Sequence, residues 1–173
     1  RPEHLILMMG ISRAGGIYVG LNPRCTPAEV AQVLTRVEPR LVASIGQFDG
    51  RASATLFSQA GELVRLPELL YFSSAAQCAD AFDSPAGPQL APACPAPDDR
   101  TAAALDRTAS IVFTSGTTGQ PKAAMLTHRG LLRAAWVQHE RLNPPNPRYL
   151  SNLPINHVGE VMNLTLSCLI GAG

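Results

Sequence analysis

A nine-residue loop at positions 114–122 holds the residue types best suited to chemistry in this sequence. The two glycines of the loop allow positive φ angles and close approach of the backbone to a ligand, and successive amide N–H groups in such a loop form an anion-binding concavity. Four hydroxyl groups and one ammonium group add further donors. The loop is therefore a candidate cradle for a polyphosphate, with a flexible Gly/Thr surface turn as the alternative. Its residues are Thr114, Ser115, Gly116, Thr117, Thr118, Gly119, Gln120, Pro121 and Lys122.

The loop differs from the usual P-loop. That motif is G-x-x-x-x-G-K-[ST] at the start of a helix, whereas Lys122 follows a proline and precedes Ala123. Apolar runs flank the loop, Ile111–Phe113 before it and Ala123–Leu126 after it, and they predict two short strands, the first of them buried. The predicted setting is strand–loop–strand, followed by an amphipathic helix over residues 127–139 in which Trp136 is a core residue.

The segment around the loop resembles a known family signature. The run IVFTSGTTGQPKAAMLTHRGLL, residues 111–132, is similar to that of the adenylate-forming (AMP-binding) enzymes, which include acyl-coenzyme A synthetases, adenylation domains of nonribosomal peptide synthetases and beetle luciferases. Leu153–Gly159 (LPINHVG) resembles the family's L-P-x-x-H-x-x-G segment, with the glycine one position nearer the histidine, and Gly20–Glu29 resembles its L-N-P strand end and T-P-x-E helix start. The matches leave out residues 47–106, and Ala123 departs from the glycine usual after the loop lysine.

This resemblance implies an α/β fold, namely part of the large N-terminal domain of such an enzyme, with a mostly parallel sheet flanked by helices. It implies that a carboxylic acid attacks the α-phosphate of ATP and that pyrophosphate leaves. The nine loop residues would then bind the ATP phosphates, with Lys122 catalytic and Thr114 near a Mg²⁺ ion. His157 would lie between the acyl pocket and the nucleotide; its alternative is an ordinary polar residue at the start of a helix.

Among the family's activities, the stretch LPINHVGE, residues 153–160, is closer to ligases for free acids. We therefore expect an AMP-forming acyl-CoA ligase of fatty acid metabolism, with ATP, Mg²⁺, coenzyme A as co-substrate and a small carboxylic acid. The alternatives are a peptide-synthetase adenylation domain that loads a carrier protein, and a catalytically dead or truncated homologue. The family's enzymes are several times longer and carry later signatures, so we interpret the chain as an internal fragment that is inactive alone. The sequence identifies neither the acid nor the thiol acceptor.

Bulk properties exclude several classes of protein. The 173 residues are 46% hydrophobic and 16% charged with a net charge of +1, which favours a globular domain and gives no basis for binding nucleic acid or an acidic membrane surface. No apolar run reaches the ~18 residues of a membrane span. The four cysteines contain no C-x-x-C pair and indicate reduced thiols in a cytoplasmic protein. They are Cys25, Cys78, Cys94 and Cys168. The oligomeric state stays open.

Helix and strand patterns alternate along the chain and predict a parallel α/β sheet. We divide the chain into an N-terminal half-subdomain (1–82), a proline-rich connection (83–106) and the phosphate-loop segment (107–173). Thr26, Pro27 and Glu29 predict a capped helix that ends at Pro39. The other predicted elements are helices at 2–14, 51–60 and 157–170 and strands at 17–21, 41–45, 69–72 and 148–152.

Overall fold

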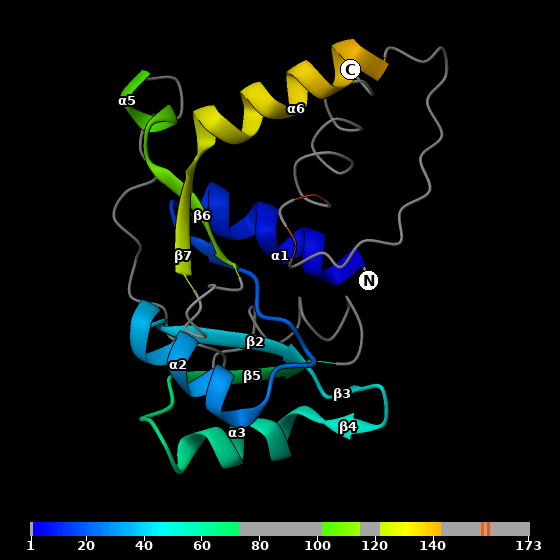
Figure 1. Ribbon diagram of the computed structural model, residues 1–173, viewed down its shortest axis with the longest axis vertical. Coiled ribbons are helices and arrows are strands. Elements are labelled where there is room, and N and C mark those ends of the chain that lie inside the picture. The colour runs from blue at the N-terminus through cyan, green and yellow to red at the C-terminus, as the bar shows by residue number, and fades with distance from the viewer. Residues whose placement is uncertain (1, 73–101, 115–121, 143–156, 158, 160–173) are drawn as a thin grey trace. The chain divides into compact units, whose positions relative to one another are not determined.

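The computed structural model describes residues 2–72, 102–114, 122–142, 157 and 159 (Figure 1). The predicted strand at 148–152 lies outside these residues, as do most of the predicted final helix and of the proline-rich connection. The chain forms two compact units, one of residues 1–5 and 21–91 and the other of residues 6–20 and 92–173. Both units combine helices with strands, so the α/β fold predicted from the sequence is confirmed.

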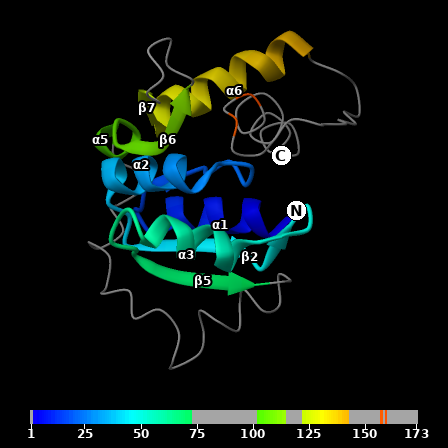
Figure 2. The same cartoon turned by 60° about the horizontal axis from the view of Figure 1, so that its bottom comes forward.

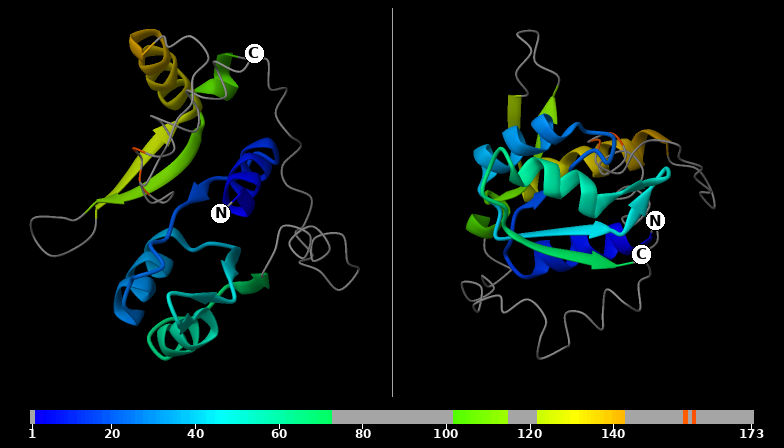
Figure 3. Two further views of the ribbon diagram at one scale, coloured as in Figure 1. Left: turned by 90° about the vertical axis from the view of Figure 1, so that its right-hand side faces the viewer. Right: turned by 90° about the horizontal axis from the view of Figure 1, so that it is seen from below.

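In the first unit, two helices pack on one face of a pair of parallel strands (Figures 2 and 3). β2 (Leu41–Ile45) pairs with β5 (Glu68–Phe72), with Leu41 opposite Glu68 and Ile45 opposite Phe72. The helices are α2 (Pro27–Val37) and α3 (Ser53–Gly61). Their apolar faces form the core, because burying these side chains removes apolar area from water. The core residues are Val30, Leu34, Leu56, Phe57 and Ala60.

The start and end of α2 follow the sequence prediction. The Glu29 backbone N–H donates to the Thr26 hydroxyl at 3.3 Å, and the Thr26 backbone N–H donates to the Glu29 carboxylate at 2.7 Å. This reciprocal capping box satisfies two amide donors that the first turn of the helix leaves without partners. At the other end, Glu38 takes a left-handed conformation (φ 44°) and donates its N–H to the Leu34 carbonyl, and Pro39 follows.

Acid should weaken this cap. Hydrogen bonds from the Thr26 backbone and hydroxyl hold the pKa of Glu29 below its ordinary value of 4.5. A depressed folded-state pKa contributes stability that is present above pH 4.5 and is lost as the pH falls through the folded value. We expect the free energy of unfolding to fall over that range, and to fall less steeply in Glu29→Gln. Urea unfolding between about pH 6 and pH 2 measures this. Glu62→Gln, at an exposed carboxylate after α3, is the control, and identical pH profiles for Glu29→Gln and the unaltered chain would contradict the expectation.

A tight hairpin precedes α3. β3 (Gln47–Phe48) pairs antiparallel with β4 (Arg51–Ala52). The two turn residues, Asp49 and Gly50, have φ angles of 51° and 75°, as the favoured two-residue hairpin turn requires. The predicted helix at 51–60 therefore begins two residues later, because Arg51 and Ala52 pair with strand β3 instead. Arg51 also donates to the Cys25 carbonyl at 3.2 Å, and Cys25 is a free thiol, as predicted.

The second unit contains a three-stranded sheet in the order β1–β6–β7. β1 (Tyr18–Val19) is parallel to β6 (Thr108–Thr114), and β6 is antiparallel to β7 (Lys122–Thr127). The remaining elements are residues 6–13 of α1 (Pro2–Arg13), α5 (Ala102–Leu105) and α6 (His128–Leu142). The predicted strands on both sides of the loop are confirmed. The predicted burial of the first is only partial, since residues 111–113 are half-buried and the buried positions of β6 are Ala109 and Ser110.

The prediction that Trp136 is a core residue is wrong, because 56% of the surface of this residue is exposed. The buried side of α6 is defined by Leu131 and Ala135, four residues apart and 7% and 0% exposed. One residue further along a helix turns the side chain by about 100°, which takes Trp136 off that side. None of the helices within the described residues is both long and apolar enough to span a membrane.

Candidate phosphate-binding site

The hairpin of β6 and β7 fixes both ends of the candidate loop. Thr114 is the last residue of β6 and Lys122 is the first of β7, and the two lie directly opposite each other. Directly opposed residues of an antiparallel pair have Cβ atoms about 5 Å apart on one face. The Thr114 hydroxyl and the Lys122 side chain therefore emerge together on one face, at the point where the loop begins and ends. Residues 115–121, the rest of the predicted phosphate cradle, lie outside the described residues.

Lys122 is available to an anion. It is the only lysine in the sequence and its side chain is exposed. In the described part of the chain, the ion pairs are Arg24–Asp49 and Arg129–Asp106, so Lys122 has no carboxylate partner there. An ammonium group without a carboxylate partner retains its full attraction for an anionic ligand. The structure therefore places an exposed positive charge at the end of the loop, on the first residue of β7.

Thr114 has a local bond of its own. Its hydroxyl donates to the Lys122 carbonyl across the hairpin at 3.4 Å. A hydroxyl oxygen is a suitable Mg²⁺ ligand, but Mg²⁺ also needs carboxylates, phosphates or water to complete its octahedron. Within the described residues, no group of three or more His, Cys, Asp and Glu side chains is placed to hold a metal. The placement of Thr114 beside a Mg²⁺ ion therefore stays a prediction.

Ala123, which stands where the family usually has glycine, fits into strand β7 without disturbing its pairing with β6. Ala123 pairs with Phe113 in regular register and is half-buried. Both neighbouring pairs, Val112 with Ala124 and Thr114 with Lys122, keep the same register. The methyl group in place of the usual glycine therefore leaves the ladder of hydrogen bonds beside the loop intact.

An ion pair that the sequence analysis missed closes the base of the hairpin. Arg129 donates to both carboxylate oxygens of Asp106, at 2.6 and 3.2 Å, and the His128 N–H donates to the Arg107 carbonyl at 3.2 Å. The bond from Arg129 lowers the pKa of Asp106. Asp106 and Arg129 each lie two residues beyond the paired strand ends Thr108 and Thr127. The strand–loop–strand prediction contained this signal, because pairing the two strands brings their outer ends together.

His157 is exposed and has one bond to its own turn. The Gly159 N–H donates to His157 Nδ1 at 3.1 Å. A neutral imidazole that accepts at Nδ1 carries its proton on Nε2, so Nε2–H is left to donate to an oxygen anion. Among the described residues, no hydrogen bond joins His157 to Thr114 or Lys122. The geometry thus brings together two of the predicted site residues and leaves the placement of His157 beside them a prediction.

Comparison with known proteins confirms the family resemblance found in the sequence. A family model described as AMP-binding enzyme matches residues 1–173. The chain is 30% identical over 184 residues to 4-coumarate–CoA ligase CCL1 of Humulus lupulus, a match that covers 99% of the chain and 31% of the relative. It is 33% identical over 124 residues to the hybrid PKS-NRPS synthetase prlS of a fungal species, covering 72% of the chain and 2% of that protein.

A solved structure of similar fold supports the α/β assignment. The crystal structure of ATP-bound MatB from Rhodopseudomonas palustris aligns over 100% of this chain and 32% of that chain, with a TM-score of 0.72 and 27% sequence identity. The chain therefore spans only about a third of the length of 4-coumarate–CoA ligase CCL1 and of the MatB chain.

Proposed function

Because the chain belongs to the AMP-binding enzyme family, whose model matches all of it, we propose that it is part of an AMP-forming acyl-CoA ligase. A carboxylate oxygen of the substrate forms a bond to the α-phosphorus of ATP, and the bond from that phosphorus to the bridging oxygen breaks. Pyrophosphate leaves with the electron pair. The thiol of coenzyme A then attacks the acyl carbon, and AMP leaves. The observation that carries the proposal is the pairing of Thr114 with Lys122 at the two ends of the loop.

In this proposal the loop stabilises the leaving group. Negative charge grows on pyrophosphate as the bond to the α-phosphorus breaks. Fixed donors aimed at developing charge are worth more to the transition state than to bound substrate, because they do not need to reorganise. The β6–β7 strands would supply this rigidity, while the exposed side chain of Lys122 follows the departing group. A Mg²⁺ ion, when bound, would neutralise phosphate charge beside Thr114.

His157 would act on the carboxylate. Its Nδ1 atom accepts from Gly159, so Nε2–H would donate to the substrate carboxylate or to the α-phosphate. No proton needs to be removed from the nucleophile, because a carboxylic acid is already ionised at neutral pH. The role of His157 is therefore to orient the acid, and not to act as a base.

Replacing His157 with alanine is expected to raise KM for the acid and lower kcat, with a combined loss of about tenfold in kcat/KM, the equivalent of one hydrogen bond. His157→Gln, which keeps an N–H donor, should recover part of the loss. Steady-state kinetics of both variants, with circular dichroism as the folding control, measures this. Unaltered kinetics in His157→Ala would assign the residue to its turn alone.

The two candidate functions, acyl-CoA ligase and carrier-protein loading, differ in the thiol that accepts the acyl group. The CoA-ligase relative matches almost the whole chain, which supports coenzyme A. The match to a PKS-NRPS synthetase supports a carrier-protein thiol instead. Incubating the whole protein with ATP, acid and either coenzyme A or a phosphopantetheinylated carrier protein separates them, because only the true acceptor is acylated at a rate that matches AMP release.

Pyrophosphate exchange tests the shared first step. With ATP, Mg²⁺ and a suitable acid, the whole protein should transfer label from pyrophosphate into ATP, since adenylation is reversible before the thiol enters. The exchange should depend on the acid. Release of γ-phosphate without AMP, across a broad panel of carboxylic acids, would contradict adenylation.

A further inference from the structure

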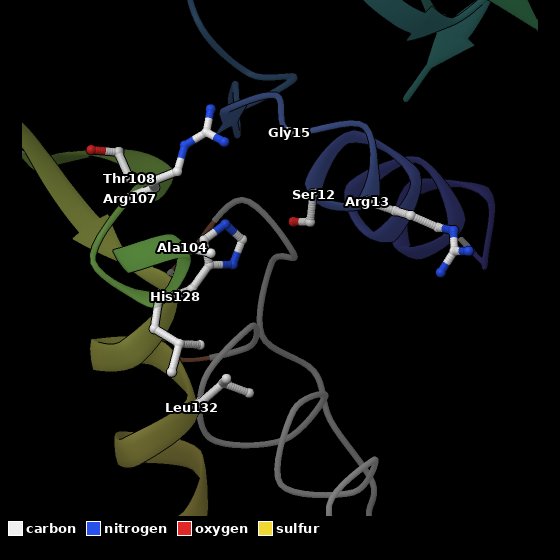
Figure 4. A pocket seen from close by; sticks show the side chains of 9 residues that line it. Ser12, Arg13, Gly15, Ala104, Arg107, Thr108, His128 and Leu132 are labelled. Atoms are coloured by element: carbon white, nitrogen blue, oxygen red, sulfur yellow. The ribbon is translucent and has the colours of Figure 1, made fainter. Parts of the chain in front are cut away.

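A second candidate site lies in the same unit as the hairpin. A cavity of about 250 Å³ opens between the end of α1, the turn from α5 into β6, and the start of α6 (Figure 4). Polar and charged side chains line much of it, and none of the lining residues that the structure describes is a carboxylate. The lining residues that carry charge or a polar side chain are Ser12, Arg13, Arg107, Thr108 and His128.

The side chains differ in how they face the cavity. The Ser12 hydroxyl and the His128 ring turn toward the space between α1 and α6, and the Arg107 guanidinium extends from the turn before β6 in the direction of Gly15 (Figure 4). The Arg13 guanidinium turns away from His128 in the same view. Arg107, His128 and Ser12 thus present a guanidinium, an imidazole and a hydroxyl, all able to donate hydrogen bonds.

The positive charge in this cavity has no internal partner in the part of the chain that the structure describes. Neither Arg13 nor Arg107 is in an ion pair there. The carboxylate next in sequence, Asp106, is already bonded at both oxygens by Arg129. A concave surface lined with one sign of charge focuses the electrostatic potential and concentrates ions of the opposite sign. Arginine also binds phosphoryl oxygens in a bidentate geometry that matches its planar fork.

This cavity is separate from Thr114 and Lys122, the two described ends of the phosphate loop. It contacts Thr108, the first residue of β6, whereas Thr114 is the last residue of that strand and pairs with Lys122. Six residue steps of an extended strand span about 20 Å. A ligand in the cavity would therefore not touch Lys122, and binding there does not depend on the proposed function of the loop.

We propose that this cavity binds a small anion that carries a phosphoryl group, held by Arg107, His128 and Ser12. The free phosphate ion and a phosphomonoester share this chemistry. The cavity volume of about 250 Å³ leaves room for a small organic group beyond the phosphoryl oxygens. Arg13 lies at the rim and contributes charge without a fixed contact.

The imidazole resonances of the 173-residue chain provide the test. The chain has four histidines, and a His128→Gln variant assigns the resonance of His128. Titration with inorganic phosphate at fixed pH and ionic strength should shift the His128 resonance saturably. In a second arm, glycerol phosphate replaces phosphate. Tighter binding of glycerol phosphate points to a phosphomonoester ligand, and tighter binding of phosphate points to the free ion. Either result supports the site.

Matched variants decide whether Arg107 carries the binding. Arg107→Gln should weaken binding at His128 by about tenfold or more, because one charge-assisted hydrogen bond is lost. Arg107→Lys keeps the charge, so its affinity should lie between those of Arg107→Gln and the unaltered chain. This variant also keeps the test valid if Arg107→Gln unfolds. Arg133→Gln, on an exposed part of α6 outside the cavity, should bind as the unaltered chain does. The proposal would be overturned by a His128 shift that does not saturate, or by a loss of affinity in Arg133→Gln equal to that in Arg107→Gln. It would also be overturned by a His128 shift that disappears in Lys122→Ala but persists in Arg107→Gln.

Discussion

Replacing Lys122 with alanine is expected to slow acyl-adenylate formation by about ten- to a thousand-fold, the usual cost of removing one preorganised donor from developing charge. ATP affinity should fall less, because the ammonium stabilises departing pyrophosphate more than it holds bound ATP. Single-turnover formation of acyl-adenylate in the whole protein separates the two effects, since it reports the chemical step without product release.

Two controls make the Lys122 result specific. Lys122→Arg keeps the positive charge with a different donor geometry and should retain more activity than the alanine variant. Arg133→Ala removes an exposed cation from α6 and should leave the rate unchanged. A single-turnover rate in Lys122→Ala equal to that of the unaltered protein would remove this residue from the mechanism.

Truncating Phe57 to alanine is expected to destabilise the first unit by about 3–5 kcal/mol, the typical cost of removing a buried aromatic ring. Phe57 is 2% exposed, is among the largest fully buried side chains of the described residues, and packs its ring against Tyr71 with centroids 6.4 Å apart. Its loss leaves a cavity between α3 and the β2–β5 strands that the surrounding helices only partly fill. Such a loss is a large share of the total stability of a domain, which is about 5–15 kcal/mol.

Urea unfolding measures this loss. Leu63→Ala is the matched control, because Leu63 follows the same helix but is 62% exposed, and such surface changes usually stay within about 0.5 kcal/mol. Equal midpoints for the Phe57 and Leu63 variants would show that the core is not centred where the structure places it.

The sequence predicted those features that depend on local chemistry. The capping box of α2 needs only Thr26 and Glu29 three residues apart, and both bonds are present. The strands on each side of the phosphate loop follow from two apolar runs, and their pairing places Thr114 opposite Lys122. Both features rest on interactions between residues close in sequence, for which the residue types largely determine the geometry.

Features that depend on which side of an element meets the core were harder to predict. Trp136 lies on an amphipathic helix, but the buried side of α6 is set by what packs against Leu131 and Ala135, which the sequence of the helix alone does not reveal. The β3–β4 hairpin was missed although Asp49-Gly50 is a turn signal, because the strands on each side have only two residues. The cavity beside His128 is lined by residues as far apart in sequence as Ser12 and Leu132, which no local pattern brings together.

Labelled oxygen tests most directly whether the carboxylate attacks the α-phosphorus of ATP. The whole protein is incubated with ATP, Mg²⁺, the thiol acceptor and a carboxylic acid labelled with ¹⁸O in both carboxylate oxygens, and the products are analysed by mass spectrometry. When the thiol displaces AMP from the acyl group, one carboxylate oxygen stays on phosphorus, so AMP should carry a single ¹⁸O and pyrophosphate none. Label found in inorganic phosphate, with AMP unlabelled, would show attack at the γ-phosphorus and contradict the adenylation mechanism.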